Sequence, residues 1–550
     1  MAARPVIWSV AGVDSGGGAG LSADARAAQA ASVHLCPVVA CITAQNSTAV
    51  LNIEPVSAAL LDAQLVALQS DMPPAAIKVG LLGSAELVTT LARRVRKLRA
   101  LWPELPLIVD PVLRASSGGS FTRDGLIRAY REQLLPLTTV LTPNRAEALA
   151  LLSEKALPAT LPVPDLAELP QLATRLRALG VGSVCITGGD LPAGKTVGQA
   201  DNESALALDW LDSPHASGWL ALRRLPAPHN HGTGCTFATF MAAAMARGFV
   251  AADAAVLAKM GTTAALLDGY AAGQGAGPVA ADPGFAQDAA LLPRLSMGAD
   301  VDELAALAAS FQPLRPSRLG SGLYTLIDQA AQAPAILAAG PGRLCALQLR
   351  FKREAHAALD QAAFEQRLQA EIGATLTATR AAGVTLYVND HWQAAHAAGA
   401  DGVHLGQEDL LGLGSAGRQT LRQARDAGLA LGISSHSLWE LCRAAALQPD
   451  YIACGPVWPT TTKDMPWRPQ GLDNLAWWAW MAPAPVVGIG GLLTPEQVTA
   501  VARSGASAAC LVRAVQSDPA RHLPLYGAAW QRGRAESRDS VPDWPHSSLD

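Results

Sequence analysis

The 550-residue sequence is poor in charged residues and in aromatic rings. Only 16% of its residues are charged and 5% are aromatic, while half are apolar. This apolar fraction excludes disorder over most of the chain, because it supplies ample material for hydrophobic cores. Lys plus Arg number 42 and Asp plus Glu number 46, which gives a net charge of −4. A charge so near zero argues against a chain devoted to nucleic acid or to a membrane surface.

Cysteine pairs and long hydrophobic runs are also missing. The eight cysteines show no Cys-x-x-Cys spacing and lie far below the density of a disulfide scaffold. We therefore expect a reducing, cytoplasmic environment. The N-terminal apolar run is too short for a secretory signal and favours a first strand. A long uncharged stretch, residues 475–495, contains three prolines and a Gly-Ile-Gly-Gly run, so we expect no membrane helix there.

Strand-like and helix-like runs divide the chain into two halves. Up to about residue 295, short apolar runs alternate with Ala-rich stretches, which is typical of βαβ units around a parallel sheet. From about residue 320, eight strand-like runs occupy a span usual for a (β/α)8 barrel, and this count favours a barrel over an open sheet. We predict an α/β domain over 1–295, a linker over 296–319 with one short helix near 301–310, a barrel over 320–533 and a loose tail over 534–550.

Two segments of the first half combine glycines with polar residues. Residues 12–20 follow the first predicted strand, and their glycines permit a ligand to approach the backbone closely. A flexible turn is the alternative, and the segment lacks the Lys-Ser/Thr ending of a Walker A loop. Residues 230–236, Asn-His-Gly-Thr-Gly-Cys-Thr, precede a predicted helix over 237–246. Free N–H groups at a helix start bind anions, and we expect Cys235 there to have a lowered pKa. The alternative is a capped helix with a buried cysteine.

Seven segments of the first half occur in an order that carries a resemblance. They are GVDSGGGAGLSAD, ITAQN, IKVGLL, VDPV, LTPNRAEA, ITGGD and NHGTGC. Over residues 5–280 the chain resembles the hydroxymethylpyrimidine and hydroxymethylpyrimidine-phosphate kinases of the ribokinase-like superfamily. The resemblance implies a ribokinase-like α/β fold, with ATP as the phosphoryl donor and Mg²⁺ as its metal.

The same resemblance implies roles for individual residues. The pyrimidine would lie near Gly12, Asp24 and Gln45. Cys235 would lie where relatives carry an Asp base that activates the hydroxymethyl oxygen, beside an anion hole formed by Gly232, Thr233 and Gly234. The residues expected to organise Mg²⁺–ATP are Asp110, Asn144 and Glu147. Thr187 is a departure, because relatives commonly carry a lysine near the ATP phosphates at this position.

Basic, hydroxyl and acidic side chains fall at the predicted strand ends of the barrel, where barrel enzymes place their chemistry. Arg350 and Lys352 lie at the end of the second strand, Asp390 follows the third and Asp409 follows the fourth. This mixture suggests a phosphorylated ligand with Mg²⁺, which takes one or two carboxylates together with phosphate oxygens. Lysines number only seven against 35 arginines, so a lysine at a strand end is more informative than usual. We interpret His404 and His436, which have no metal-ligand partner at short spacing, as structural or supporting residues.

The segments QLRFK, YVND, DGVHLGQEDL, LGISSHS, DYIACGPVWPTTTK and VVGIGGL carry a second resemblance. Over residues 320–515 the chain closely resembles thiamine phosphate synthase. The resemblance implies that pyrophosphate leaves hydroxymethylpyrimidine diphosphate and that the thiazole nitrogen captures the resulting methyl cation. It assigns Gln348, Arg350, Lys352 and Asn389 to the pyrimidine diphosphate, Asp390 and Asp409 to Mg²⁺, Ser434, Thr460, Thr462 and Lys463 to the diphosphate and thiazole phosphate, and Gly491 to a backbone phosphate site. Arg513 departs from the serine that many relatives have.

Together the two resemblances imply a bifunctional enzyme of thiamine biosynthesis, in which the kinase product is the substrate of the synthase. Two alternatives remain open at this point. The barrel could be a thiazole tautomerase-like isomerase, or the first half could bind a pyrimidine without phosphorylating it. The expected partners are small molecules, with Mg²⁺ and ATP as cofactors and no nucleic acid or membrane. A homo-oligomer is left open.

Overall fold

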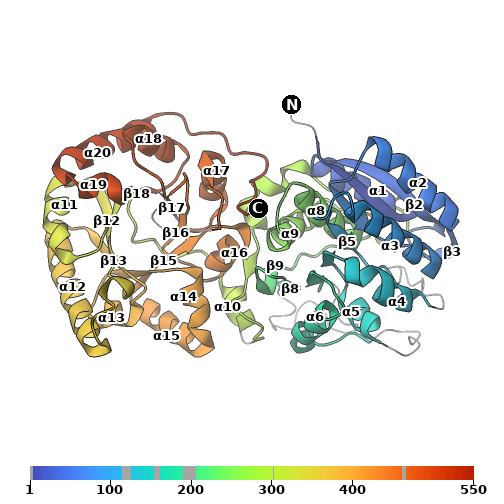
Figure 1. Cartoon of the computed structure of the whole chain (residues 1–550), viewed down its shortest axis with the longest axis horizontal. Coiled ribbons are helices and arrows are strands. Elements are labelled where there is room, and N and C mark those ends of the chain that lie inside the picture. The colour runs from blue at the N-terminus through green and yellow to red at the C-terminus, as the bar shows by residue number, and fades with distance from the viewer. Residues whose placement is uncertain are drawn as a thin grey trace. The chain divides into compact units, whose positions relative to one another are not determined.

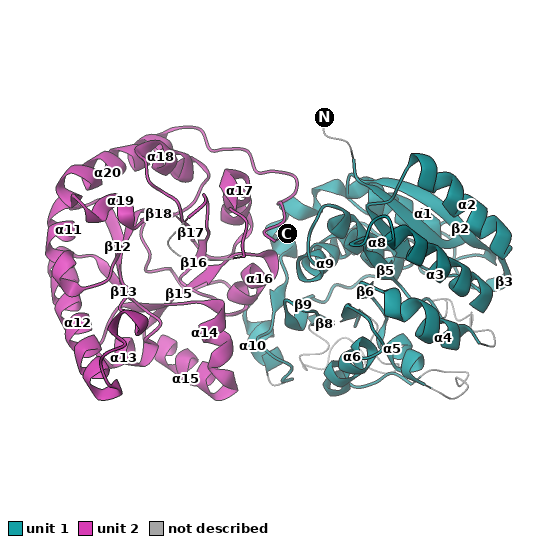
Figure 2. Ribbon diagram, in the orientation of Figure 1, with its two compact units in different colours: residues 1–311 teal, residues 312–550 magenta. Residues whose placement is uncertain are grey.

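The computed structural model describes residues 4–113, 125–153, 162–189, 206–301, 303–460 and 466–549. The chain forms two compact units, residues 1–311 and residues 312–550 (Figure 2). Each unit has its own β-sheet and its own buried apolar core.

A ten-stranded sheet forms the centre of the first unit (Figure 1). Its order is β10-β9-β8-β7-β6-β5-β4-β1-β2-β3. The six central strands are parallel to one another, namely β7, β6, β5, β4, β1 and β2. Antiparallel strands lie at both edges, with β3 beside β2 and β8, β9 and β10 beyond β7. The strands are β1 (Val6–Asp14), β2 (His34–Gln45), β3 (Val50–Pro55), β4 (Ala76–Val79), β5 (Leu107–Val109), β6 (Val140–Leu141), β7 (Ser183–Ile186), β8 (Leu206–Asp212), β9 (Ser217–Arg223) and β10 (Arg294–Leu295).

The strand order reverses between β1 and β4, since β2 lies on one side of β1 and β4 to β7 follow on the other. Ligands of such sheets bind beyond the carboxyl ends of the strands beside the reversal. Helix α8 packs against α1 and against α9, and α2 packs against α3. The helices are α1 (Gly20–Ala30), α2 (Ala58–Asp71), α3 (Ala85–Arg99), α4 (Leu126–Ala129), α5 (Arg145–Leu152), α6 (Leu169–Arg177), α8 (Thr233–Ala246), α9 (Ala251–Leu267) and α10 (Glu303–Ala309).

The second unit is a closed barrel of eight parallel strands, in which β18 pairs with β11. All eight predicted strand-like runs are barrel strands, so the predicted (β/α)8 barrel is confirmed. Its interior is filled by buried apolar and aromatic side chains, including three tyrosines. The strands are β11 (Gly322–Ile327), β12 (Leu344–Leu349), β13 (Thr385–Asn389), β14 (Gly402–Leu405), β15 (Ala430–Ser435), β16 (Tyr451–Cys454), β17 (Val486–Ile489) and β18 (Ala508–Leu511).

Helices follow the barrel strands and surround the barrel (Figure 1). Several begin at a side-chain cap, as at Asp360, Ser437 and Thr494, whose oxygen accepts a backbone hydrogen bond of the first helical turn. The helices are α11 (Ala333–Ala339), α12 (Gln361–Ala382), α13 (Trp392–Ala397), α14 (Gln407–Gly412), α15 (Gly414–Asp426), α16 (Leu438–Ala446), α17 (Gly471–Met481), α18 (Pro495–Arg503), α19 (Arg513–Gln516) and α20 (Pro519–Ala535).

The segments predicted as linker and tail are more ordered than expected. Helix α10 coincides with the short helix predicted near 301–310, and the first unit extends through Phe311. The tail is not loose over its described residues. The Arg503 side chain donates to Asp539 (2.6 Å), and the His546 N–H donates to Asn474 (2.8 Å). Composition alone could not reveal these contacts, because their partners lie on α17 and α18.

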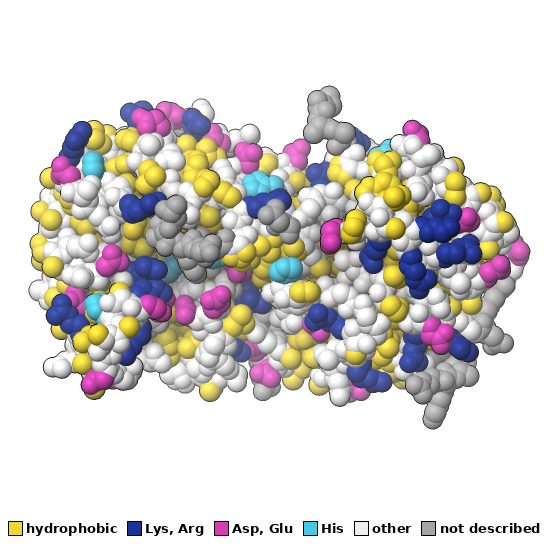
Figure 3. All heavy atoms as spheres, viewed as in Figure 1, with side chains coloured by type: hydrophobic (Ala, Val, Ile, Leu, Met, Phe, Trp, Pro, Cys, Tyr) yellow, Lys and Arg dark blue, Asp and Glu magenta, His cyan; other side chains and the backbone are white. Residues whose placement is uncertain are grey.

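Acidic and basic side chains both occur on each unit, on the face drawn in Figure 3. Neither sign forms a field that covers a whole unit in this view, in keeping with the net charge of −4. Among the described residues, no helix combines the length and the apolar character that a membrane span requires.

Candidate functional sites

The loop after β1 is organised by the carboxylate of Asp14. Its Oδ1 accepts a hydrogen bond from the Gly16 N–H (2.8 Å), and its Oδ2 accepts from the Gly18 and Ala19 N–H groups (3.1 and 2.9 Å). Burial alone would raise the pKa of Asp14, but His231 and these N–H groups together hold that pKa below its usual value. Asp14 is therefore a structural anion that shapes the glycine-rich loop.

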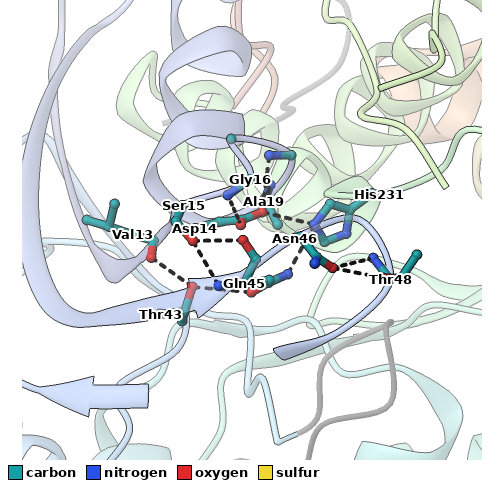
Figure 4. Close-up of polar contacts among 12 residues, drawn as sticks. Val13, Asp14, Ser15, Gly16, Ala19, Thr43, Gln45, Asn46, Thr48 and His231 are labelled. Atoms are coloured by element: carbon teal, nitrogen blue, oxygen red, sulfur yellow. Dashed lines mark hydrogen bonds and ion pairs between the residues drawn. The ribbon is translucent and has the colours of Figure 1, made fainter. Parts of the chain in front are cut away.

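The glycine-rich loop packs directly against the start of α8. His231 Nε2 lies 2.9 Å from Asp14 Oδ2 and 3.3 Å from Gln45 Nε2 (Figure 4). A Cβ at Gly18 would lie 2.1 Å from the His231 ring, and a Cβ at Gly232 would lie 2.3 Å from the Gly18 carbonyl oxygen. Glycine is required at both positions, and the structure thus brings Gln45 and the predicted anion loop together through His231.

A buried ion pair lies beneath these loops. Lys78 Nζ on β4 lies 2.9 Å from both carboxylate oxygens of Asp24 on α1, and neither side chain is exposed. Ser9 and Thr239 also donate to Asp24, at 2.6 and 2.9 Å. Despite burial, which would lower it, the pKa of Lys78 is raised by the charge of Asp24 and, more weakly, by Cys235 and Asp110. Asp24 therefore supports the site from below, with its oxygens occupied by protein groups.

The expectation of a lowered pKa for Cys235 is wrong. Burial raises the pKa of this thiol to about 12, although Lys78 and a backbone hydrogen bond at Gly20 oppose the rise. The nearby carboxylates of Asp24 and Asp110 raise the pKa further. A position in the first turn of α8 is thus not enough to form a thiolate here, because burial opposes ionisation and two negative charges lie close to the sulfur.

The three residues predicted to organise Mg²⁺–ATP lie at the carboxyl ends of β5 and β6. Asp110 is buried, and a Cβ at Gly234 would lie 3.6 Å from its Oδ2. Burial raises the pKa of Asp110 to about 6, with Lys78 opposing and Asp24 adding to the rise. Asn144 and Glu147 cap α5 reciprocally at 2.8 and 3.0 Å. The structure thus brings Asp110 to the anion loop, while Asn144 and Glu147 hold the start of the neighbouring helix.

The turn that carries Thr187 contains an arginine contact. Arg224 donates from Nη1 to the Gly189 carbonyl at 2.7 Å and from Nη2 to the Gly188 carbonyl at 3.5 Å. A Cβ at Gly188 would lie 2.1 Å from the Leu208 carbonyl oxygen, so this turn admits only glycine there. A positive charge therefore lies beside the turn, although Thr187 itself supplies none.

A cavity of about 550 Å³ opens at the carboxyl ends of the barrel strands. Seven of the residues predicted for the synthase site line it, namely Arg350, Lys352, Asp390, Asp409, Ser434, Thr460 and Gly491. Arg513, the departure from the relatives, also lines it. Thr462 and Lys463 lie outside the described residues.

The two predicted metal ligands lie close together at this cavity. Asp390 Oδ2 is 2.5 Å from Lys352 Nζ, and Asp409 Oδ2 accepts from the Gly406 N–H at 2.8 Å. Burial raises the pKa of Asp409, and so do the charge and hydrogen bond of Asp390, against the opposing effects of Gly406 and Lys352. Among the described residues no group of three or more His, Cys, Asp and Glu side chains could hold a metal. Two adjacent carboxylates still fit Mg²⁺, which completes its shell with water and phosphate oxygens.

Gln348 and Asn389 lie below the cavity in the barrel interior. Gln348 Nε2 donates to Asn389 Oδ1 at 2.7 Å, and both side chains are buried. His404 is buried beside them, and burial lowers its pKa to about 4. His436 lines the cavity, where its ring stacks on Trp467 and its Nδ1 lies 3.0 Å from Glu440. Both histidines make the protein contacts expected of supporting residues.

Gly491 lies in a backbone conformation that favours glycine, with φ at +72°. A Cβ there would lie 2.6 Å from the Trp458 Cβ and 2.8 Å from the Trp458 carbonyl oxygen. The preceding Gly490 also has a positive φ, of +93°. This double turn brings bare backbone to the edge of the cavity, which is the property that a backbone phosphate site needs.

Sequence reasoning missed Asp14, Lys78 and His231. Each lies inside a segment that already carried the resemblance, namely GVDSGGGAG, IKVGLL and NHGTGC. A signal was available for Lys78, because it is a charged residue inside a run that otherwise predicts a buried strand. Its partner could not be deduced, since Asp24 lies 54 positions away on a helix.

Comparison with known proteins matches each unit to a separate family. Residues 14–280 match the family described as phosphomethylpyrimidine kinase, and residues 323–515 match thiamine monophosphate synthase. A hydroxymethylpyrimidine/phosphomethylpyrimidine kinase of Synechococcus elongatus is 37% identical over 50% of this chain and 97% of its own length. A Bacillus subtilis pyridoxal kinase solved as an ADP complex is 27% identical, covers 51% of this chain and 98% of its own, and has a TM-score of 0.43. That score is too low to add to the assignment.

The fold and the two sites thus define a two-domain enzyme, with a ribokinase-like phosphotransferase followed by a (β/α)8 synthase. The bifunctional thiamine biosynthetic enzyme TH1 of Arabidopsis thaliana, described as chloroplastic, is 30% identical over 89% of this chain and 85% of its own length. The chain belongs to this family of bifunctional thiamine biosynthetic enzymes. A tautomerase-like barrel is not favoured, because the similarity to the bifunctional enzyme TH1 extends over 89% of this chain.

Proposed function

We propose that the first domain transfers phosphate from ATP to hydroxymethylpyrimidine and to its monophosphate, at the edge formed by β1, β5 and α8. The proximity of Asp110 to Gly234 carries this proposal. It sets a carboxylate next to N–H groups at the start of a 14-residue helix, and such groups stabilise a transferring phosphoryl group. Mg²⁺ held near Asp110 would neutralise phosphate charge. Gln45, held by His231, faces the same loops and is the pyrimidine contact we favour.

Cys235 acts in this proposal as a positioned thiol near the hydroxymethyl oxygen. A thiol with a pKa of about 12 is protonated at neutral pH. Phosphoryl transfer passes through a loose transition state in which bonding to the attacking oxygen is still weak. A strong base is therefore not needed early in the reaction, and orientation of the hydroxyl is sufficient. Arg224, which donates to the carbonyls of Gly188 and Gly189, would supply the positive charge that Thr187 does not.

We propose that the barrel expels pyrophosphate from hydroxymethylpyrimidine diphosphate and joins the pyrimidine methylene carbon to the nitrogen of thiazole phosphate. Arg350 and Lys352 lie at the cavity beside Asp390 and Asp409. Positive side chains there would stabilise the charge that accumulates on departing pyrophosphate. Mg²⁺ bound by the two aspartates would supply further charge neutralisation. Gly491 would bind phosphate through its backbone, and Thr460 would line the same subsite.

The experiment that tests both assignments uses the whole chain. ATP, Mg²⁺, hydroxymethylpyrimidine and thiazole phosphate are supplied together, and thiamine phosphate is the product measured. A second reaction without ATP, supplied instead with hydroxymethylpyrimidine diphosphate, isolates the barrel. Product in the second reaction and none in the first would mean that the first unit binds pyrimidine without phosphorylating it. A reducing compartment stays a prediction from the eight free cysteines.

A further inference from the structure

A chain of hydrogen bonds crosses the interior of the barrel below the cavity. Ser434 Oγ lies 2.8 Å from His404 Nε2, and His404 Nδ1 lies 2.7 Å from the Tyr451 hydroxyl. The Tyr451 hydroxyl lies 2.7 Å from that of Tyr324, which donates to Gln348 Oε1 at 2.8 Å. Gln348 then donates to Asn389, so the chain draws on six of the eight strands.

The two ends of this chain belong to different parts of the proposed site. Ser434 lines the cavity and is expected to hold phosphate. Gln348 and Asn389 lie below the cavity and are expected to hold the pyrimidine diphosphate, and we take Gln348 to face its pyrimidine end. The middle members do not line the cavity. Tyr324 is 1% exposed and Tyr451 is 0% exposed, and both hydroxyls have their hydrogen-bond partners within the protein.

The chemistry of the middle members fixes the donor-to-acceptor direction of every hydrogen bond in this series. Each tyrosine hydroxyl has one hydrogen, and a neutral imidazole has one N–H. Because Tyr324 donates to Gln348, its oxygen must accept from Tyr451. Tyr451 must then accept from His404 Nδ1, which leaves Nε2 bare to accept the hydrogen of Ser434. In this state Ser434 presents only lone pairs to the cavity.

A phosphate oxygen at Ser434 requires the opposite arrangement, because it can accept a hydrogen bond but cannot donate one. A site in which Ser434 donates to phosphate requires the other neutral tautomer of His404, with its one proton on Nε2 instead of Nδ1. With that tautomer both tyrosine hydroxyls point in the opposite direction. The Gln348 amide would then donate to Tyr324 and accept from Asn389. The hydrogen-bonding groups of both ends therefore change together.

We propose that Tyr324, Tyr451 and His404 are positioning residues that couple Ser434 at the phosphate end to Gln348 at the pyrimidine end. The inference rests on the proposed roles of Ser434 and Gln348 in the synthase reaction. It adds residues that touch no substrate and yet determine which groups the site offers to substrate.

The barrel contains a matched control in Tyr387. Its ring lies 5.0 Å from that of Tyr451 and 6.1 Å from that of Tyr324, and it is equally buried. Its hydroxyl has no hydrogen-bond partner among the residues that the structure describes. Tyr387→Phe therefore removes a buried hydroxyl from the same layer without interrupting the series of hydrogen bonds, whereas Tyr451→Phe interrupts it.

The test measures thiamine phosphate formed from supplied hydroxymethylpyrimidine diphosphate and thiazole phosphate, with the whole chain and no ATP. We expect Tyr451→Phe to lower kcat/KM about tenfold, which corresponds to one buried hydrogen bond. Tyr387→Phe should leave kcat/KM within about twofold of wild type. Tyr324→Phe also interrupts the series of hydrogen bonds, so it should lower kcat/KM to the same extent. It replaces Tyr451→Phe in the test if Tyr451→Phe folds poorly.

A mutant cycle separates coupling from simple loosening of the barrel. Ser434→Ala and Gln348→Ala share no hydrogen bond, so any non-additivity between them must pass through other groups. We expect non-additivity in the wild-type and Tyr387→Phe backgrounds and additivity in the Tyr451→Phe background. Equal behaviour of the two Phe backgrounds would refute the coupling. A wild-type chain that forms no thiamine phosphate would instead refute the function assigned to the barrel.

Discussion

The two units place different chemistry in the layer beneath their sites. Below the loops of the first unit lies a fully buried ion pair, Lys78 and Asp24, with Asp110 and Cys235 within electrostatic reach. Below the barrel cavity lies an uncharged layer of tyrosines, a neutral histidine and two amides. The charged groups Lys352 and Asp390 of the barrel lie at the cavity itself.

This difference explains why Cys235 in the first unit is not a thiolate, although a buried lysine lies near it. A buried lysine cannot suppress the pKa of Cys235, because two carboxylates lie near the same sulfur and burial opposes ionisation. In the barrel the charges at the cavity can meet a metal and a substrate directly. The first unit therefore depends on a permanent internal charge balance, whereas the barrel depends on charges that ligands complete.

The largest effect is expected from breaking the buried ion pair. Lys78→Met would leave Asp24 buried without a counter-charge, so we expect the free energy of unfolding of the first unit to fall by about 3–5 kcal/mol. Chemical denaturation monitored by kinase activity measures this change. Lys97→Met removes an exposed lysine and is the control. The Asp24→Asn/Lys78→Met double variant should recover part of the loss, and a double variant no more stable than Lys78→Met would contradict the account.

The fold was largely predictable from the sequence, and the charge balance was not. The eight barrel strands and the βαβ pattern follow from local periodicity and from polar residues at strand ends. The Lys78–Asp24 pair joins a strand to a helix, and the Tyr324–Tyr451 contact joins two strands 127 residues apart. No local pattern encodes such partners. The sign of the pKa change at Cys235 failed for the same reason, since it depends first on burial of the thiol and then on charged groups that folding brings near it.

The next largest effect concerns the barrel carboxylates. Asp409→Asn and Asp390→Asn each remove one of two adjacent charges, so we expect synthase kcat/KM at limiting Mg²⁺ to fall about 100-fold, while kinase activity is unchanged. Glu408→Gln, which removes an exposed neighbouring charge at the same cavity, is the matched control. If the Asp variants and Glu408→Gln respond alike across a Mg²⁺ titration, neither aspartate is a ligand.

A smaller effect is expected at Cys235. If its protonated thiol orients the substrate hydroxyl, Cys235→Ala should lower the kinase kcat about tenfold, and Cys235→Ser should restore most of it. Coupling of supplied hydroxymethylpyrimidine diphosphate should be unaffected in both. A serine variant as slow as the alanine variant would mean that the sulfur itself, and not an orienting hydrogen bond, is required.

The smallest effect is expected from cutting the chain between the units. Phe311 belongs to the first unit, because its carbonyl accepts from Arg223 at 2.8 Å and its ring lies 4.8 Å from the Arg294 guanidinium. A cut near Ala308, in the middle of the predicted linker, would fall inside α10 and remove these contacts, whereas a cut after Phe311 keeps them. Each piece then retains its own sheet and core, and each is large enough to be stabilised by a core of its own.

We therefore expect residues 1–311 and residues 312–550 to be soluble when expressed separately and to keep their activities. Mixed at saturating hydroxymethylpyrimidine diphosphate, the two pieces should form thiamine phosphate at the rate of the intact chain, since covalent joining changes only local concentration. At low intermediate concentration the mixture should be slower. A barrel piece that stays far slower even at saturation would mean that its uncharged layer depends on the first unit, and the two sites could not then be treated as independent.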